Sequence, residues 1–213
     1  MLLLALLSLP DCEAQEAISK VSKGQFIQSW EAARDSIYIV CRGTVAKAGL
    51  IPAHFNLQDA YATHVGLGWW DGEGFFVHHV SNEKIPGMDA FRKEKLAAFI
   101  SGEDVFYISL VAVKDALATP ALAAKLLRAY RQQAIEFDFE FEEGNGSYYC
   151  SEWVVAFLQK LSPAGLQFTP TKRMISHALA RSLLQRDTLT YYPVDFYTGK
   201  EGWSSAKKFL FEK

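Results

Sequence analysis

The 213-residue chain has only three cysteines, which excludes a scaffold held together by several disulfides. It has no basic excess either, since 22 Lys and Arg stand against 24 Asp and Glu. Nucleic acid is therefore not an expected partner, because phosphate binding needs a surplus of positive charge. No apolar run approaches the roughly 18 residues of a membrane-spanning helix, so no transmembrane segment is expected.

Aromatic residues are abundant, at 14 % of a chain that is 50 % hydrophobic and 22 % charged. This balance is typical of a globular domain with a large core, or with a pocket built from flat apolar side chains. No internal repeat and no long linker divides the sequence. We therefore expect one domain over residues 17–213.

The amino terminus differs from the rest of the chain. Residues 1–9 (MLLLALLSL) are almost purely Leu and Ala, and polar residues follow. A short apolar run at this position predicts a secretory signal over 1–16, and hence export to the periplasm or the extracellular space. Acylation of Cys12 would instead give a lipoprotein. Because Pro10 and Asp11 fit acylation poorly, plain secretion is favoured.

Apolar runs and helical spacing alternate along the chain in a mixed order. Strands are expected at 36–41, 63–70, 75–80, 105–113, 137–141 and 189–192. Helices are expected at 24–34, 86–100, 119–136, 148–161 and 171–186, with a loop over 42–61. This order predicts an α+β domain with a mainly antiparallel sheet packed against helices.

Cys150 stands where a glycine-containing turn (GNGS) leads into an apolar helix. The first turn of a helix carries free backbone N–H groups and the positive end of the helix dipole. Both stabilise a thiolate and lower the pKa of the thiol, and the same N–H groups can bind an oxyanion. The position indicates a cysteine nucleophile. The alternative is a structural cysteine, since this residue type is often buried in cores.

Three of the five histidines lie in an expected β-hairpin, whose two strand-like runs flank a Gly-rich turn (DGEG). If the turn is centred on Gly72 and Glu73, Gly66 faces His79 across the pair of strands. The register then decides which of the histidines share a face of the sheet.

Alternation places His64 and His79 as diagonal neighbours on one face of the hairpin and His78 on the other. One imidazole can take the proton of the thiol while the second fixes its tautomer. Gly66 leaves this face open for a substrate or for the cysteine helix. The alternative is that the histidines of the hairpin are incidental.

Two other chemistries fit the same residues less well. His64, His79 and Cys150 are a possible set of zinc ligands, but the chain has no HExxH and no CxxC pair. Ser151 follows the cysteine, but its flanks do not form a GxSxG elbow. No metal and no other cofactor is expected.

At these residues the chain resembles the circularly permuted branch of the NlpC-type, papain-fold cysteine hydrolases, in particular its YiiX/YebB-like group. In that branch the histidine strand precedes the cysteine helix. The resemblance covers roughly residues 35–196. Its matching motifs are an H-V-G strand at His64-Val65-Gly66, an F-D-x-x-F segment at Phe137-Asp138 and Phe141, a Y-C-S-E helix start at Tyr149-Cys150-Ser151-Glu152, and a Y-P-x-D segment at Tyr192-Pro193-Val194-Asp195.

The resemblance implies a permuted papain-like fold with Cys150 as nucleophile and His64 as general base. The third, polar position falls on His79, as in the usual Cys-His-His set and in relatives similar to lecithin retinol acyltransferase. In YiiX-like proteins we expect an acidic residue there, so this departure leaves the substrate class open. The family's G-D pair is matched only by Asp35, because Arg34 replaces the glycine.

The expected function is an exported cysteine hydrolase that cleaves amide bonds. Its partner would be a peptide or acyl-amide substrate, and the stem peptide of peptidoglycan is the first choice. The alternatives are a lipid-directed amidase, thioesterase or acyltransferase of the same fold, and a non-catalytic or zinc-binding module. Tyr149, Asp138 and Gly66 are the candidate substrate-binding residues.

Overall fold

The computed structural model describes residues 18–46, 52–176, 178–198, 200, 203 and 206–212. The expected signal segment 1–16, with Cys12, lies outside the described residues. In the described part, no helix is long and apolar enough to cross a membrane.

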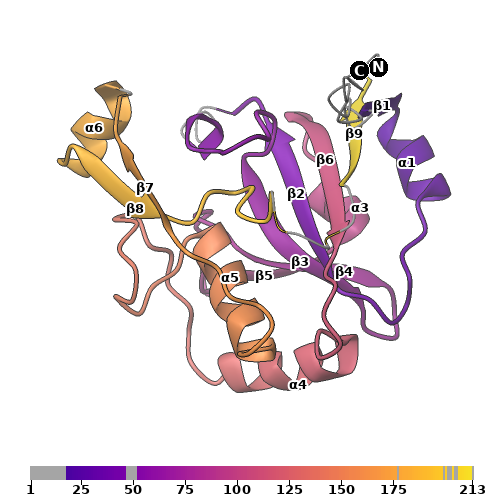
Figure 1. Cartoon of the computed structure of the whole chain (residues 1–213). Helices are drawn as coiled ribbons and strands as arrows, with labels where there is room; N and C mark the ends of the chain where they lie inside the picture. Colours follow the sequence, from indigo (N-terminus) through magenta and orange to yellow (C-terminus); the bar gives the residue numbers. More distant parts are fainter. Residues whose placement is uncertain are drawn as a thin grey trace, which may run out of the picture.

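The fold is built on a seven-stranded sheet with the order β1-β9-β6-β2-β3-β4-β5 (Figure 1). Its strands are β1 (Ile18–Val21), β2 (Tyr38–Thr44), β3 (His64–Trp70), β4 (Phe75–Val80), β5 (Phe91–Lys95), β6 (Val105–Ala112) and β9 (Lys207–Phe211). Neighbouring strands are antiparallel except β1 and β9, the first and last strands, which lie side by side and parallel. The expectation of an α+β fold with a mainly antiparallel sheet is confirmed.

The helices and a small second sheet surround this sheet. They are α1 (Lys23–Ser29), α3 (Leu96–Phe99), α4 (Pro120–Tyr130), α5 (Cys150–Leu161), α6 (Ala178–Leu184) and the antiparallel pair β7 (Thr171–Met174) and β8 (Thr188–Tyr191). Helix α5 packs against β3 and β4, with α4 beside it. Figure 1 shows β7, β8 and α6 at one side of the molecule and α1 at the other.

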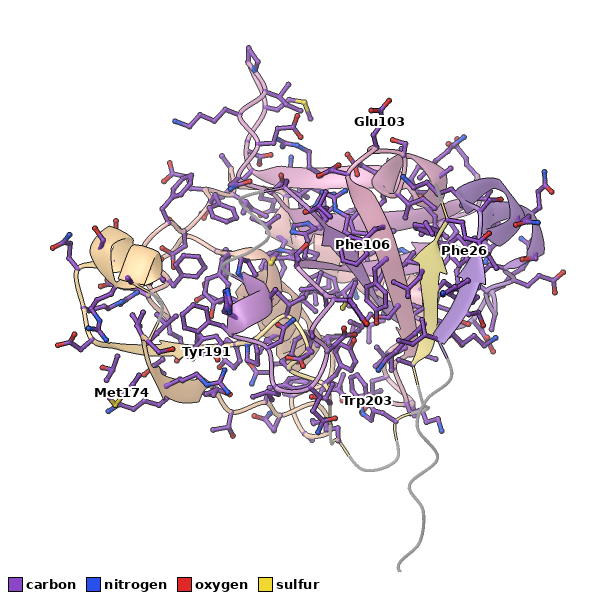
Figure 2. All side chains as sticks on the ribbon, turned by 90° about the horizontal axis from the view of Figure 1, so that it is seen from above. Phe26, Glu103, Phe106, Met174, Tyr191 and Trp203 are labelled. Carbon is purple, nitrogen blue, oxygen red and sulfur yellow. The ribbon has the colours of Figure 1, made fainter. Side chains whose placement is uncertain are left out.

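Each face of the sheet carries its own apolar core, because side chains alternate along the strands. On one face, Trp69 of β3 stacks on Phe157 of α5. On the other face, Val77 packs with Phe99 of α3 and Phe26 of α1. Figure 2 shows Phe26 and Tyr191 on opposite sides of the molecule. Helix α5 therefore covers one face and the short helices α1 and α3 cover the other.

The expected hairpin register is confirmed. Leu67 pairs with His78, and Gly68 pairs with Val77. His78 stacks on Trp69 on the α5 face, with ring centroids 3.8 Å apart. The strand at 105–113 and the helix that begins near Cys150 are also confirmed, as β6 and α5.

Two segments were predicted wrongly. Residues 86–100 are not one helix, because β5 pairs with β4 and only Leu96–Phe99 is helical. Residues 137–141 form no strand beyond a single bridge from Phe137 to Tyr148. The carboxylate of Asp138 accepts the backbone N–H groups of residues 140 and 142, at 2.7 Å each, and so folds this segment into a loop.

Element boundaries differ elsewhere because pairing decides them. The helix predicted over 171–186 begins as strand β7 and becomes helical only in α6. Strand β2 runs on to Thr44, into the segment expected to be a loop, and 52–54 form a helical turn. Helices α1 and α4 end earlier than predicted, and the strands β1 and β9 were not predicted.

Candidate active site

Cys150 is the first residue of α5, and its flanking residues fix the start of this helix. The Tyr149 hydroxyl accepts the backbone N–H of Tyr192 at 2.8 Å, and Ser151 Oγ donates to the Tyr192 carbonyl at 2.6 Å. Cys150 is 9 % exposed, so the thiol lies at the edge of the core. Tyr149, a candidate substrate-binding residue, thus anchors the helix and also lines the cavities described below.

Glu152 completes the first turn of α5 as a buried carboxyl group. The backbone N–H groups of Tyr149 and Gly144 face it and favour its charged form. Burial, together with the nearby carboxylate of Asp138, outweighs them and raises the pKa of Glu152 to about 7. Through these two N–H groups, Glu152 connects Gly144, in the turn before α5, to Tyr149, which precedes the cysteine.

The two expected histidines form a hydrogen-bonded chain that ends on an acidic residue. His64 Nε2 lies 2.8 Å from His79 Nδ1, and His79 Nε2 lies 3.3 Å from Glu94 Oε2 on β5. The hydrogen bond from His79 lowers the pKa of Glu94, so Glu94 is an ionised acceptor.

This chain fixes the tautomers, because a carboxylate can only accept. Nε2–H of His79 donates to Glu94, so Nδ1 of neutral His79 accepts from Nε2–H of His64. Nδ1 of His64 is then left unprotonated. That is the state required of a general base.

Burial decides the protonation states of both partners. It lowers the pKa of His64 well below the usual value, and the positive charge of Arg42 and the neighbouring His79 lower it further. Burial raises the pKa of Cys150, although backbone N–H groups of Val65, Ser151 and Cys150 itself lower it. The expected net lowering of the Cys150 pKa is therefore wrong, because desolvation outweighs the helix N–H groups. At neutral pH thiol and imidazole are both uncharged.

Cys150 and His64 line one cleft of about 690 Å³, within the usual size range of ligand sites. Its lining is mixed. The polar and charged lining residues are Arg42, Thr44, His64, Ser81, Asn82, Glu83, Asp104 and Glu140, and the apolar ones are Ala46, Pro52, Phe137, Phe139, Phe141, Tyr149, Ala180 and Leu184. The nucleophile and the base therefore face a cleft that offers both polar and apolar contacts.

The cysteine helix does not pack on the face that carries the two histidines. His64 and His79 lie against Phe99 on the α3 face, whereas α5 packs on the Trp69 face. The two sides meet at the end of β3, where the Val65 N–H faces the Cys150 sulfur. Among the described residues, no hydrogen bond joins this sulfur to His64.

Gly66 is not the open position that we expected. A Cβ on Gly66 would lie 2.9 Å from the His79 Cβ and 2.8 Å from the His78 carbonyl oxygen. Glycine lets β3 and β4 approach closely and so sets the spacing of the histidine pair. Asp138 likewise does not line the cleft, since both its oxygens hold the 138–142 loop.

Two site residues were missed by sequence reasoning. Glu94 lies in the segment predicted as a helix, and a helix there would not pair with the strand of His79. The signal that indicates it is a third strand-like segment, FRKEK, ten residues after the end of the hairpin. Arg42 pairs with His64 across β2 and β3, and its guanidinium donates to the Phe99 carbonyl at 2.7 Å.

No protein-family model matches the chain, and no curated protein matches it. Among solved structures, it is similar to the metalloprotein YiiX from Escherichia coli O157:H7, of DUF1105, with a TM-score of 0.54. The identity is 15 %, and the match covers 82 % of this chain and 96 % of that chain. The chain has a YiiX-like fold.

The description of YiiX as a metalloprotein raises the question of a metal at the corresponding residues. Within the described ranges, no group of three or more His, Cys, Asp or Glu side chains is placed to hold a metal ion. His64 Nε2 and His79 Nδ1 are hydrogen-bonded to each other, so these two nitrogens are not free to hold a metal ion. These three residues therefore do not form a ligand set in this arrangement.

Proposed function

We propose that the protein is a cysteine hydrolase that cleaves a carboxylic acid derivative, with Cys150 as nucleophile and His64 as general base. The sulfur attacks the carbonyl carbon while Nδ1 of His64 takes the thiol proton. His64 then protonates the leaving group, which departs as an amine, alcohol or thiol. Water hydrolyses the thioester, which restores the thiol and releases the acid. The observation that carries the proposal is the position of both residues in one cleft.

The uncharged state of both partners suits this mechanism. A neutral His64 accepts the proton as the sulfur attacks, so no thiolate has to be stored in a buried site. The backbone N–H groups that face the sulfur are available to the oxyanion of the tetrahedral intermediate. The thiol–imidazole hydrogen bond that the mechanism needs would form in the complex with substrate, because catalytic hydrogen bonds often tighten only there.

The wider assignment is part of the same proposal. A permuted papain-like placement is supported by the order of the histidine strand β3 and the cysteine helix α5, together with the Cys-His-His set. Export to the bacterial envelope and cleavage of a cell-wall peptide follow from the resemblance and from residues 1–9. The runner-up, an acyl ester or amide of a lipid, is favoured by one observation, the apolar lining beside Cys150.

The proposal is tested by trapping the acyl-enzyme. Wild-type protein is mixed with p-nitrophenyl acetate or with p-nitrophenyl butyrate, and each reaction is quenched in acid. The mass of the intact protein is then measured by mass spectrometry. We expect one acyl group, mapped to Cys150 by peptide mass and released by neutral hydroxylamine, as a thioester requires. Acylation confined to lysines or serines, or no acylation at all, would count against a cysteine nucleophile.

Glu94 supplies a separate prediction about positioning. Glu94→Gln keeps the shape but allows an amide N–H to face His79, which favours the wrong tautomer of the histidine pair. We expect kcat to fall about ten- to hundredfold, with KM little changed, because a group that acts through another residue is lost. Glu94→Asp should restore part of the rate.

The matched control for Glu94 is Glu73→Gln, an exposed change in the turn between β3 and β4. It should leave kcat within about twofold. The measurements are steady-state kinetics and the pH profile of kcat for the wild type and the three variants. If Glu94→Gln lowers thermal stability but not kcat, Glu94 has only a structural role.

A further inference from the structure

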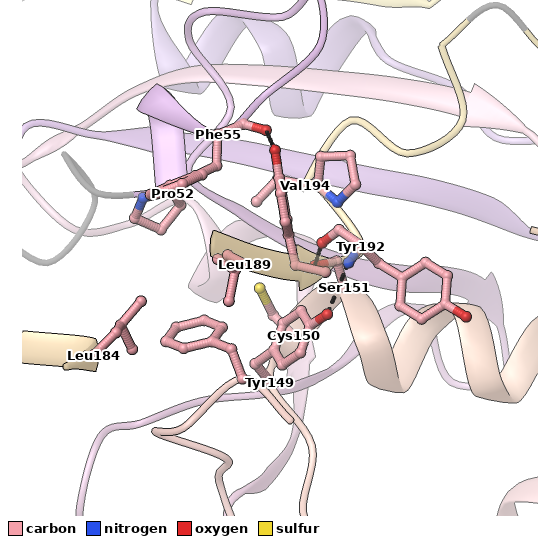
Figure 3. Close-up of a pocket in the computed structure, with 12 residues that line it drawn as sticks. Pro52, Phe55, Tyr149, Cys150, Ser151, Leu184, Leu189, Tyr192 and Val194 are labelled. Carbon is pink, nitrogen blue, oxygen red and sulfur yellow. Dashed lines mark hydrogen bonds between the residues drawn. The ribbon is translucent and has the colours of Figure 1, made fainter. Parts of the chain in front are cut away.

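A narrow inner pocket opens at the nucleophile, and its lining is almost wholly apolar. The residues that line it are Pro52, Phe55, Phe141, Tyr149, Cys150, Ser151, Leu184, Leu189, Tyr191, Tyr192, Pro193 and Val194. Figure 3 shows the Cys150 sulfur pointing into the space between these side chains. Its free volume of about 50 Å³ holds about three or four methylene-sized groups.

The hydroxyl groups in this lining are already used within the protein. Ser151 Oγ donates to the Tyr192 carbonyl at 2.6 Å, and the Tyr191 hydroxyl donates to the Phe55 carbonyl at 2.5 Å (Figure 3). The Tyr149 hydroxyl accepts the Tyr192 N–H at 2.8 Å. Each of these hydroxyl groups already makes a hydrogen bond within the protein, and the rest of the lining is almost wholly apolar. A polar group that enters the pocket therefore gives up water for few new partners.

The inner pocket and the outer cleft share five residues, which are Pro52, Phe141, Tyr149, Cys150 and Leu184. Phe141 holds a left-handed backbone conformation, with φ at 53°. For a bulky side chain this conformation is costly, and it persists only where the surroundings impose it. Asp138 imposes it by accepting the N–H groups of residues 140 and 142, on either side of Phe141. The loop thus places an aromatic ring where pocket and cleft meet.

We infer that the inner pocket is an acyl subsite, and that the substrate is an ester, thioester or amide whose acyl part is a short or branched alkyl group. This inference rests on the proposed function and narrows it. The acyl chain occupies the apolar pocket with its carbonyl at Cys150. The polar leaving group lies on the wall of His64 and Arg42, where it receives the proton taken from the thiol.

The charged residues of the cleft and the apolar lining of the inner pocket together favour the acyl group, rather than the leaving group, as the occupant of the pocket. Arg42, Glu83 and Asp104 on the cleft wall can face a polar, hydrated leaving group. An extended peptide would instead carry an unpaired N–H and C=O into the inner pocket at each residue. The peptide stem is therefore the less suitable occupant of this pocket, although its amide fits the chemistry.

Alkyl methanethiosulfonates test the pocket without requiring turnover. The Cys150 sulfur attacks the sulfenyl sulfur of the reagent, the thiol proton is lost, and methanesulfinate leaves, so the alkyl group is attached next to the nucleophile. Second-order rate constants are measured for the methyl to decyl reagents by quenched intact mass, divided by those of free glutathione. Peptide mapping confirms the site as Cys150.

We expect the normalised rate to rise by up to about fourfold per methylene, the transfer free energy of one CH₂. From methyl to butyl the rise should be at least tenfold, and it should level off once about four carbons fill the pocket. A rate independent of chain length, or one that falls from methyl to butyl, would overturn the inference.

Leu184→Asp places a charge at the junction of pocket and cleft, on a half-buried position that tolerates a polar group. It should abolish the dependence on chain length, so that the butyl rate of this variant lies within about threefold of its own methyl rate. Leu127→Asp, an equally half-buried change on α4, is the control and should keep the wild-type dependence. Retained dependence in Leu184→Asp would contradict the inference.

The outcomes separate the inference from the proposed function. An acyl-enzyme on Cys150 together with a flat chain-length series leaves the hydrolase standing and removes the acyl subsite. A steep series without any acyl-enzyme shows an apolar pocket beside a cysteine that does not catalyse. The steep series with the acyl-enzyme supports both.

Discussion

Cys150→Ala is expected to reduce kcat/KM by about four orders of magnitude or more, because the change removes the atom that forms the covalent bond. The fold should survive, since alanine at the first position of α5 keeps the helix start and removes one sulfur. We expect the free energy of unfolding to change by about 1 kcal/mol or less. The measurements are steady-state hydrolysis of the p-nitrophenyl esters and chemical denaturation of both proteins.

The chain offers its own matched control in Cys41. This thiol is fully buried in β2 and lies 3.5 Å from the Tyr197 hydroxyl. Both cysteines are free, so no disulfide between them complicates the comparison. Cys41→Ala should leave kcat/KM within about threefold. Equal losses in the two variants would show that damage to the core, and not loss of the nucleophile, explains the effect at Cys150.

The hairpin is the part of the fold that local sequence determines most completely. A Gly-rich turn fixes the register, and the period of two then assigns every side chain of β3 and β4 to a face. That is why the contact of His64 with His79 could be predicted before the structure was known, and it is found at 2.8 Å. The start of α5 was predictable for a similar reason, because its turn and its apolar helix adjoin in sequence.

The part of the site that could not be predicted depends on long-range pairing. The apolar spacing of Met88, Phe91 and Leu96 fits a helix, but this segment lies beside a strand that lacks a partner, and it forms β5. Glu94 reaches His79 only because of that pairing. A local sequence pattern does not show which strand of a sheet lacks a partner. The contact of Glu94 with His79 could therefore not be predicted from it.

The pKa of Cys150 shows a different limit of local reasoning. The helix start favours a thiolate, and this effect is present in the N–H groups that face the sulfur. Burial of Cys150 raises the pKa and outweighs this effect. That burial depends on β7, β8 and the segment around Tyr192. Those elements follow Cys150 in the chain and cover it only after folding. The sign of the shift is therefore a property of the tertiary structure.

His64→Ala is expected to lower kcat/KM by about 10²- to 10⁴-fold, the usual contribution of a general base. The pH profile of the wild type distinguishes this role further. Burial and the charge of Arg42 lower the pKa of His64, so its unprotonated form persists as the pH falls through 6.5, the ordinary value. kcat/KM should accordingly stay flat from pH 8 down through pH 6.5 and decline only at lower pH. A half-maximal rate at pH 6.5 or above would contradict a depressed His64 pKa.

The control for His64 is His78, its neighbour on the opposite face of the hairpin. Burial lowers the pKa of His78 to about 3, and its ring stacks on Trp69. His78→Phe keeps a neutral aromatic ring in this stack and should keep kcat/KM within about threefold. Because buried neutral histidines bind protons once the chain unfolds, stability falls as the pH drops below about 6.5. Circular dichroism at each pH therefore shows whether a lower rate comes from protonation of the base or from unfolding. In His64→Ala the decline due to protonation of the base should be absent from the pH profile, and the decline due to unfolding should remain.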